Sequence, residues 1–474
     1  MSEKLDVTMH KFGSIEPPDR IIGIETEYTV PARLYNTGLE TLATLGYLAV
    51  PGVASWLRNG GVLYCDLGHL EYASPESLGP LDALASDHAG ANIMNALWRR
   101  HDPTSKPPLR RSATFDIDTY VQSDQHTQQH DAGLLVSTKG YHENYLIPRP
   151  DTSTDKELFK RVIGSYLATR AIWYGSGMYL GGRFSLTQKS TGIGAGLRVN
   201  GYGSYRASEG EKPLAAILDG TDKIGAQAAI LEVRNADPHM LRAATLMGLG
   251  VTSLVLRLLE VGIIAHSNAA KFAVTDEYRA TQLSDVHANI TGNVLTTLDG
   301  ENISPLELQM RFVQAVHDLG RHVKLPSDEQ YVAQKWLEIC IALDAYIHGN
   351  EAAGKSLKGH VEWFTKQYYA QKLAAKHDKV GNPYFYVAFD TQWTALTDTP
   401  LVTPRLSRLA ESDTLFTGVE SRIAERTVTP PRTRAQKRIK IMQDFGVTSV
   451  DWARVIDTRG NPHTMESPYA DCVE

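Results

Sequence analysis

The order of sequence patterns along the chain predicts an α+β fold, in which an antiparallel sheet has a concave functional face and helices cover its other face. Strand-like alternation and glycine-rich turns dominate up to Val233, and long helical patterns dominate from Pro238 onward. Strands that are gathered before the helices, instead of alternating with them, are typical of this class. The sequence Thr-Asp-Thr-Pro near residue 397 then introduces a smaller C-terminal domain, residues 397–474.

The N-terminal part of the chain begins with a polar segment, residues 1–19. We expect a flexible leader there and no signal peptide, because the segment has no apolar run. Strands are expected from residue 20 to about 146, separated by helices at 39–58 and 81–100. Asn59-Gly60-Gly61 is a hairpin signal that leads directly into the next strand.

The remaining elements follow from the same patterns. Residues 102–129 are polar and predict a surface loop with one short strand at 112–121. Further elements are expected as a helix at 157–174, strands between 181 and 233, and helices at 306–323, 329–348 and 361–377. The most apolar stretch, 241–265, contains Arg242, Arg257 and Glu260, so it predicts a buried helix and not a membrane span.

The composition is that of an ordinary globular protein. With 474 residues, 42% of them hydrophobic and 22% charged, the chain is long enough for one large and one small domain. A net charge of −6 gives no general attraction to nucleic acid or anionic membranes, and we expect neither as a partner. Its cysteines, Cys65, Cys340 and Cys472, are odd in number and far apart, which favours free thiols in the cytoplasm over disulfides or a zinc site.

Polar side chains occur at strand spacing in three N-terminal segments. Because successive side chains on a strand point to opposite faces, each segment places one couple on a common face: Glu25 with Glu27, Tyr64 with Asp66, and His142 with Asn144. Carboxylates with an imidazole suit Mg2+ or Mn2+, which retain waters and bridge to phosphates. The pattern therefore favours a site for a metal and a nucleoside triphosphate, the alternative being polar edge residues that face water.

These segments also carry a resemblance to a known family. Gly-Ile-Glu-Thr-Glu-Tyr from residue 23, Glu-Tyr-Ala-Ser-Pro-Glu from residue 71 and His-Glu-Asn-Tyr-Leu from residue 142 resemble the family of the Pup ligase PafA and the Pup deamidase Dop. The similarity extends to Asp451-Trp452 near the end of the chain. It implies a glutamine synthetase-like fold, a carboxylate-amine ligase domain at residues 20–396, and ATP with Mg2+ as cofactors. The implied partners are Pup or a Pup-like peptide as carboxylate donor and a lysine or other amine as acceptor.

The resemblance also implies roles for single residues. Glu25, Tyr64 and Glu71 match the magnesium ligands of the family, and Asp66 matches its catalytic aspartate. Ser74 and Trp452 match its nucleotide contacts. Glu27, His142 and Asn144 lie within the same motifs, and we expect the first two to ligate metal and Asn144 to contact the nucleotide.

Several positions depart from the family pattern. Val62 stands where the family has an arginine that contacts nucleotide, and Ala229 and Ile230 replace paired arginines. Glu232 replaces a histidine and is predicted to ligate the metal in its place, since a carboxylate suits a hard cation. Family motifs are also altered at Leu218 to Asp222, where an arginine and a histidine are lost, and at Thr187-Gln188-Lys189, where lysine replaces arginine.

Three functions remain open at this stage. The first is an ATP-dependent ligase that forms an amide through an acyl phosphate, favoured by the short link from Tyr28 to Asn59. The second is an amide hydrolase that uses the same site, favoured by the deamidase-like spacing from Asp66 to Glu71. The third is a nucleotide-binding protein with a decayed site. A basic run is explained best as a solvated helix face, with an acidic partner peptide as the alternative: Arg432, Arg434, Lys437, Arg438 and Lys440.

Overall fold

The computed structural model of the chain describes most of its length in separate ranges. These are residues 19–29, 48–50, 54–66, 69–101, 109–111, 114–116, 127–129, 135–137, 140–150, 152–180, 183–188, 199–201, 214–218, 224, 227–275, 290, 294–397, 414–465 and 467–469. The predicted leader and the predicted linker near residue 397 therefore lie almost wholly outside the described residues, and the domain boundaries stay predictions.

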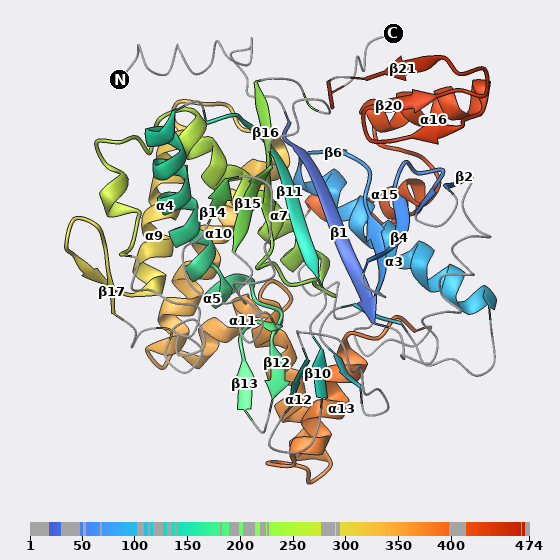
Figure 1. Cartoon of the computed structure of the whole chain (residues 1–474). Helices are drawn as coiled ribbons and strands as arrows, with labels where there is room; N and C mark the ends of the chain where they lie inside the picture. The colour runs from blue at the N-terminus through green and yellow to red at the C-terminus, as the bar shows by residue number, and fades with distance from the viewer. Residues whose placement is uncertain are drawn as a thin grey trace.

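A large sheet forms the centre of the molecule (Figure 1). Its middle strand is β1 (Ile21–Thr29), which pairs with β11 (Tyr141–Pro148) on one side and β5 (His69–Ala73) on the other. The sheet continues beyond β11 through β16 (Ala228–Val233), β15 (Ala215–Leu218) and β14 (Val199–Gly201), and beyond β5 through β4 (Val62–Asp66), β3 (Ala54–Trp56) and β2 (Leu48–Val50). The short strands β6 (Ser77–Leu78) and β7 (Arg110–Arg111) also pair with β1. Among the described strands of this sheet, the pairs are antiparallel except β14 with β15, which confirms the predicted sheet type.

Helices cover one face of this sheet. Helix α7 (Arg242–Glu260) lies behind β1 and β11 in Figure 1, and α3 (Gly79–His101) extends to the right of β1. Ile22, Ile24 and Ile147 form one core with apolar side chains of both helices. The layer is extended by α4 (Ser153–Thr169), α5 (Ala171–Tyr174), α9 (Pro305–Gly320) and α10 (Ser327–Ile347). Helix α7 has the length and hydropathy of a membrane span, but 89% of its most apolar window is buried inside the protein, as expected for a core helix.

Smaller elements complete this part of the chain. They are the three-stranded sheet of β8 (Thr114–Asp116), β9 (Thr127–Gln129) and β10 (Leu135–Ser137), the hairpins β12 (Met178–Leu180) with β13 (Arg183–Ser185) and β17 (Leu295–Thr296) with β18 (Asn302–Ile303), and the helices α11 (Gly354–Leu357), α12 (Glu362–Lys376), α13 (Pro383–Trp393), η4 (Ala269–Lys271) and η5 (Glu351–Ala353). Strand β8 falls inside the predicted short strand at 112–121.

The predicted helix at 39–58 is wrong where the structure describes it. Strands β2 and β3 occupy its C-terminal part, and Pro51-Gly52 lies between them, a pair that opposes helix continuation. Trp56 lies opposite Val62 in the β3–β4 hairpin, and the two side chains join one apolar cluster. Residues 30–47 lie outside the described part.

The predicted hairpin signal, in contrast, is confirmed. Gly60 has a φ of 82°, a conformation that glycine adopts without a Cβ penalty. The backbone N–H groups of Leu57 and Gly61 close the turn by donating to the carbonyl oxygen of Gly61 and to Asn59 Oδ1, at 2.9 and 3.0 Å. Strand β4 thereby starts in register with β3.

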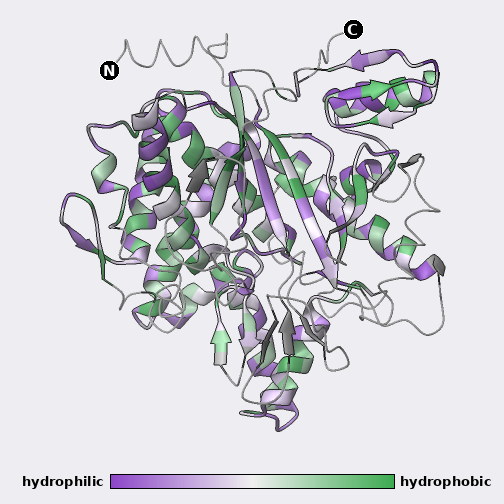
Figure 2. Cartoon of the chain, in the orientation of Figure 1, coloured by the Kyte–Doolittle hydropathy of each residue, from purple (hydrophilic) through white to green (hydrophobic). Residues whose placement is uncertain are grey.

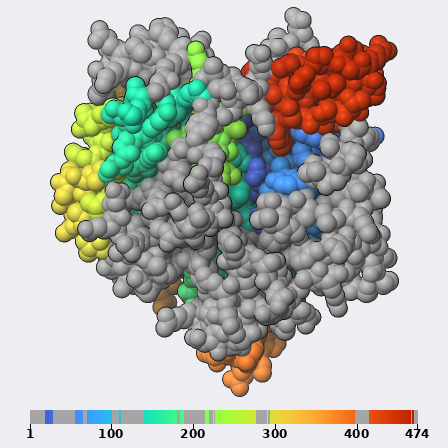
Figure 3. Space-filling model, viewed as in Figure 1, coloured from blue at the N-terminus to red at the C-terminus, as the bar shows by residue number. Residues whose placement is uncertain are grey.

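The C-terminal unit, residues 414–465, packs on the end of the sheet. It consists of η6 (Thr414–Phe416), α15 (Val419–Arg426), α16 (Arg434–Phe445) and the strands β19 (Ser449–Val450), β20 (Arg454–Ile456) and β21 (Pro462–Thr464). Ile439, Met442 and Val455 of this unit form one apolar cluster with Trp56 and Val62 of the sheet. The unit lies at the upper right of the space-filling view (red in Figure 3), next to the blue N-terminal strands.

A buried ion network ties the same unit to the sheet. Glu76 accepts hydrogen bonds from Arg434 Nε at 2.7 Å and from Arg438 Nη2 at 2.9 Å. Arg438 Nη2 also donates to the carbonyl oxygen of Gly60 at 3.2 Å. The expectation that the basic run is a solvated helix face is therefore wrong for Arg434 and Arg438, which are 3% and 0% exposed. Both guanidinium groups are buried because they pair with Glu76 inside the interface.

Candidate metal and nucleotide site

The face of the sheet opposite the helices carries Glu25, His142, Asn144 and Glu232, four of the side chains predicted to bind metal or nucleotide, and we call it the polar face. Along β11, buried and half-buried residues alternate strictly, and His142 and Asn144 are half-buried. Strand β1 is hydrophobic where it starts and hydrophilic further along (Figure 2). Register places Glu25 opposite His142, and Asn144 opposite Glu232. The pairing of three strands therefore brings together residues that are far apart in the sequence.

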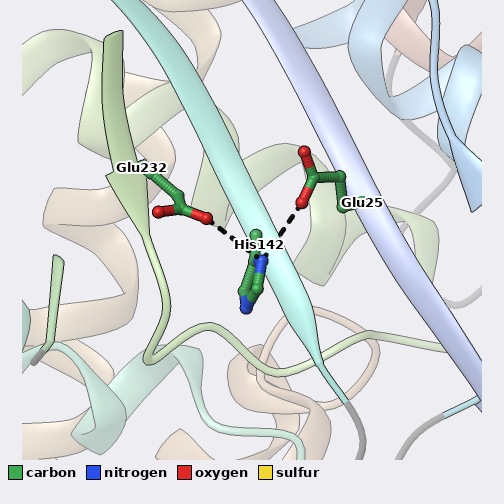
Figure 4. Close-up of side chains that lie close together, drawn as sticks. All are labelled: Glu25, His142 and Glu232. Carbon is green, nitrogen blue, oxygen red and sulfur yellow. Dashed lines mark hydrogen bonds and ion pairs between the residues drawn. The ribbon is translucent and has the colours of Figure 1, made fainter. Parts of the chain in front are cut away.

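Glu25, His142 and Glu232 form what we call the acidic cluster (Figure 4). His142 Nδ1 lies 3.2 Å from Glu25 Oε2 and 3.4 Å from Glu232 Oε1. One ligand atom from each residue lies within 4.8 Å of the others. Asn144 Nδ2 donates to Glu25 Oε1 at 3.3 Å. Two carboxylates and an imidazole at this spacing fit a hard divalent cation that keeps several waters.

A second acidic group adjoins the cluster on the polar face. Glu27 lies opposite Glu71 in the pairing of β1 with β5, and Tyr64 lies opposite Glu71 in the pairing of β4 with β5. The Tyr64 hydroxyl donates to Glu71 Oε1. Glu27 Oε2 accepts from the backbone N–H of Gly140 at 2.7 Å, and a Cβ on Gly140 would lie 2.5 Å from Glu27 Oε1. The structure thus places the three residues in one row, and their role as metal ligands stays a prediction.

Asp66, the predicted catalytic residue, ends β4 and its backbone lies opposite His69. Its side chain lies outside the described residues, as does the segment 67–68 that follows it. Tyr64, two residues earlier, has a described side chain that is half-buried. The catalytic role of Asp66 stays a prediction.

The predicted nucleotide contacts Ser74 and Trp452 already have partners in this structure. Ser74 Oγ accepts from the backbone N–H of Ile24 at 2.9 Å and donates to the carbonyl oxygen of Pro75 at 3.1 Å. The ring of Trp452 packs edge-on against Trp56 with centroids 5.1 Å apart, in the apolar cluster that Tyr64 and Val62 also join. Val62 thus fills a packing role at the position where the family pattern expects an arginine.

Two further departures from the family pattern lie near the sheet. Thr187 Oγ1 and the backbone N–H of Gln188 donate to the two oxygens of buried Asp237, at 2.9 and 3.1 Å, and Lys189 lies outside the described residues. Leu218 ends β15, and residues 219–223 lie outside the described part.

A buried network below the polar face fixes β11. Glu143, which points to the helix side between His142 and Asn144, is fully buried. It accepts hydrogen bonds from Arg170 Nη1 at 2.9 Å and from the Tyr174 hydroxyl at 2.5 Å. Burial raises the pKa of Tyr174, and the charge of Glu143 adds to the effect. The hydroxyl therefore stays protonated and donates a hydrogen bond to Glu143. The backbone of β11, which carries His142, is therefore fixed by contacts on the helix side of the sheet.

Sequence reasoning missed Arg234, which follows β16 directly. Its Nε and Nη2 atoms donate to Glu232 Oε2 at 2.8 and 2.6 Å. Period two from Glu232 was the signal that could have found it, since residues two apart share a face of a strand.

Comparison with known proteins agrees with this fold. A crystal structure of the complex between Pup and its ligase PafA superposes with a TM-score of 0.74 at 18% identity, covering 97% of this chain and 92% of that chain. A structure of PafA in complex with ADP gives a TM-score of 0.68 at 18% identity, covering 93% of this chain and 90% of that chain. The chain therefore has the fold of these ligases.

Sequence comparison gives the family. Pup–protein ligase from Bifidobacterium dentium is 27% identical over 97% of this chain and 92% of its own length. The corresponding ligase from Acidimicrobium ferrooxidans is 26% identical over 76% of this chain and 74% of its own length. The family model described as Pup-ligase protein matches residues 41–456, and the chain belongs to this family.

Proposed function

We propose that this protein is an ATP-dependent ligase that joins a carboxylate of Pup, or of a Pup-like peptide, to the amine of a lysine or a similar acceptor, in the cytoplasm. The observation that carries the proposal is the acidic cluster on the polar face of a Pup-ligase fold. Family membership over residues 41–456 supports the reaction class, and the PafA structure with ADP supports ATP as the nucleotide.

We assign the following roles to residues of the chain. Glu25, His142 and Glu232 would hold Mg2+, which neutralises charge on the nucleotide phosphates when bound. Asn144 keeps the Glu25 carboxylate oriented through its hydrogen bond. Asp66 would accept a proton from the attacking ammonium group, so that the free amine can reach the acyl phosphate.

The test is a mass measurement on the reaction products. The protein is incubated with ATP, Mg2+, a Pup peptide ending in glutamate and an amine acceptor. A ligase yields a product with the mass of both substrates less one water, and one ADP for each product. Release of ammonia from a Pup peptide ending in glutamine, with no ADP formed, would assign the chain to the hydrolases instead. Absence of nucleotide binding would refute both enzyme functions.

Metal binding through Glu232 is tested separately. Glu232→Ala is expected to weaken Mg2+ binding and ligation together, since the cluster loses one of its carboxylates. Glu232→His is expected to restore part of both, because imidazole can occupy the same position but suits a hard ion less well. A metal titration that is unchanged in Glu232→Ala would show that this position has no part in the metal site.

A further inference from the structure

Arg234 holds only one of the two oxygens of Glu232. Both donors recorded for its guanidinium, Nε and Nη2, reach Oε2, at 2.8 and 2.6 Å. The other oxygen, Oε1, is the one that lies 3.4 Å from His142 Nδ1. The carboxylate is therefore divided, with one oxygen engaged by the guanidinium and the other presented to the acidic cluster.

The pair sits where such an interaction has a strong orienting effect. The side chains of Arg234 and Glu232 are only 20% and 10% exposed. Charge-assisted hydrogen bonds of this kind are roughly twice as strong as neutral ones. The backbone N–H of Arg234 also donates to the carbonyl oxygen of Leu214 at 2.8 Å, which fixes the base of the side chain against the neighbouring strand segment. Rotation of the Glu232 carboxylate would break both guanidinium contacts at once.

Arg234 also changes the charge that the cluster presents. The cluster contains two carboxylates, Glu25 and Glu232, and the Arg234 guanidinium forms an ion pair with one of them. The arginine thus offsets the charge that a glutamate at position 232 adds, and it lessens repulsion of the nucleotide phosphates.

We propose that Arg234 is a positioning residue of the metal site. It fixes Glu232 so that Oε1 alone is offered to a divalent cation, and it acts on the metal through Glu232 without being a ligand. The proposal rests on the function proposed above and extends it to a residue outside the ligand set. Loss of an outer-shell partner of a metal ligand typically costs 10–100-fold in metal affinity, which sets the expected effect.

The experiment measures Mn2+ binding to the full chain without nucleotide, by the loss of the free-ion electron paramagnetic resonance signal. The variants are Arg234→Met, Glu232→Gln and the double variant. Arg234→Met is expected to weaken Mn2+ binding by about 10-fold or more. The double variant is expected to bind no more weakly than Glu232→Gln, because Arg234 acts through Glu232. Arg234→Lys, which keeps the charge but loses the fork, is expected to fall between Arg234→Met and the unchanged protein.

The matched control is Arg161→Met on helix α4. Arg161 Nε donates to Glu157 Oε1 at 2.6 Å, so this variant removes a similar contact from a pair outside the acidic cluster. It is expected to leave Mn2+ binding unchanged. If Arg234→Met does not fold, as judged by circular dichroism, the comparison of Arg234→Lys with the unchanged protein decides.

Four results would overturn the proposal. Unchanged or tighter Mn2+ binding in the Arg234 variants would show that the arginine does not hold Glu232 in a binding position. Losses that add in the double variant would show that Arg234 acts independently of Glu232. Weaker ATP binding of the same variants in calorimetry, with unchanged Mn2+ binding, would make Arg234 a phosphate contact. Failure of the unchanged protein to bind Mn2+ would refute the metal site itself, and thus that part of the proposed function as well.

Discussion

Glu76→Gln is expected to weaken the attachment of the C-terminal unit to the sheet by about 3 kcal/mol. Burial alone would raise the pKa of Glu76, but the charges of Arg438 and Arg434 outweigh it and lower the pKa from 4.5 to about 2. At about 1.4 kcal/mol for each unit of pKa, this difference corresponds to roughly 3 kcal/mol of stability. The value agrees with the 3–5 kcal/mol typical of breaking a buried ion pair by removing one partner.

The assay is urea unfolding, with hydrogen exchange of the α16 amides to show where the loss occurs. The folded pKa of Glu76 lies below its unfolded value, so the contribution is complete above about pH 4.5 and disappears as the pH falls toward 2. The difference between the unchanged protein and Glu76→Gln should therefore narrow on acidification. The control is Asp444→Asn, which breaks the exposed Lys440–Asp444 pair on the same helix and should cost less than about 1 kcal/mol. A loss below about 1 kcal/mol in Glu76→Gln at pH 7 would refute the reasoning.

Four further outcomes are expected. Asp66→Asn should lower product formation by about 100-fold or more with ATP binding kept, as for a lost general base, and retention of over roughly a tenth of the activity would exclude that role. Removal of divalent ions with EDTA should weaken ATP binding in calorimetry, and equal affinity with and without metal would contradict the bridging function. Gly90→Ala in α3 should cost about 2 kcal/mol, because the new Cβ would lie 2.1 Å from Tyr72 Cε1, and an unchanged melting temperature would contradict this packing. Cys340 is fully buried and burial raises its pKa, so thiol reagents should label it only after unfolding, and rapid labelling of the native chain there would count against the core described.

The polar face was predictable because it depends on a local property. Alternation in β1 and β11 determines which side chains share a face, whatever strands lie beside them. The neighbours themselves could not be predicted from alternation, since β11 pairs with both β1 and β16 across long stretches of sequence. The place of Glu232 beside His142 was reached through the family pattern and not through periodicity. Its role in binding metal stays a prediction.

The failures share one physical cause, which is that tertiary contacts override local patterns. The helix expected at 39–58 gives way to β2 and β3 because the sheet edge and the C-terminal unit provide partners for Trp56. The basic run has the pattern of a solvated helix face, but the fold places Glu76, 358 residues from Arg434 in the sequence, in contact with it. No pattern within α16 indicates that a carboxylate from the sheet is buried against that helix.

The Glu76 network also has a consequence for the order in which the chain folds during synthesis. Glu76 emerges from the ribosome 362 residues before Arg438. If the sheet folds before α16 is synthesised, Glu76 lacks the two guanidinium groups that neutralise it. Trp56 and Val62 then also lack the apolar side chains of the C-terminal unit that cover them. This part of the sheet is therefore expected to reach its final packing late in folding and to be a candidate for recognition by chaperones. Truncation before residue 414 would make that transient state permanent.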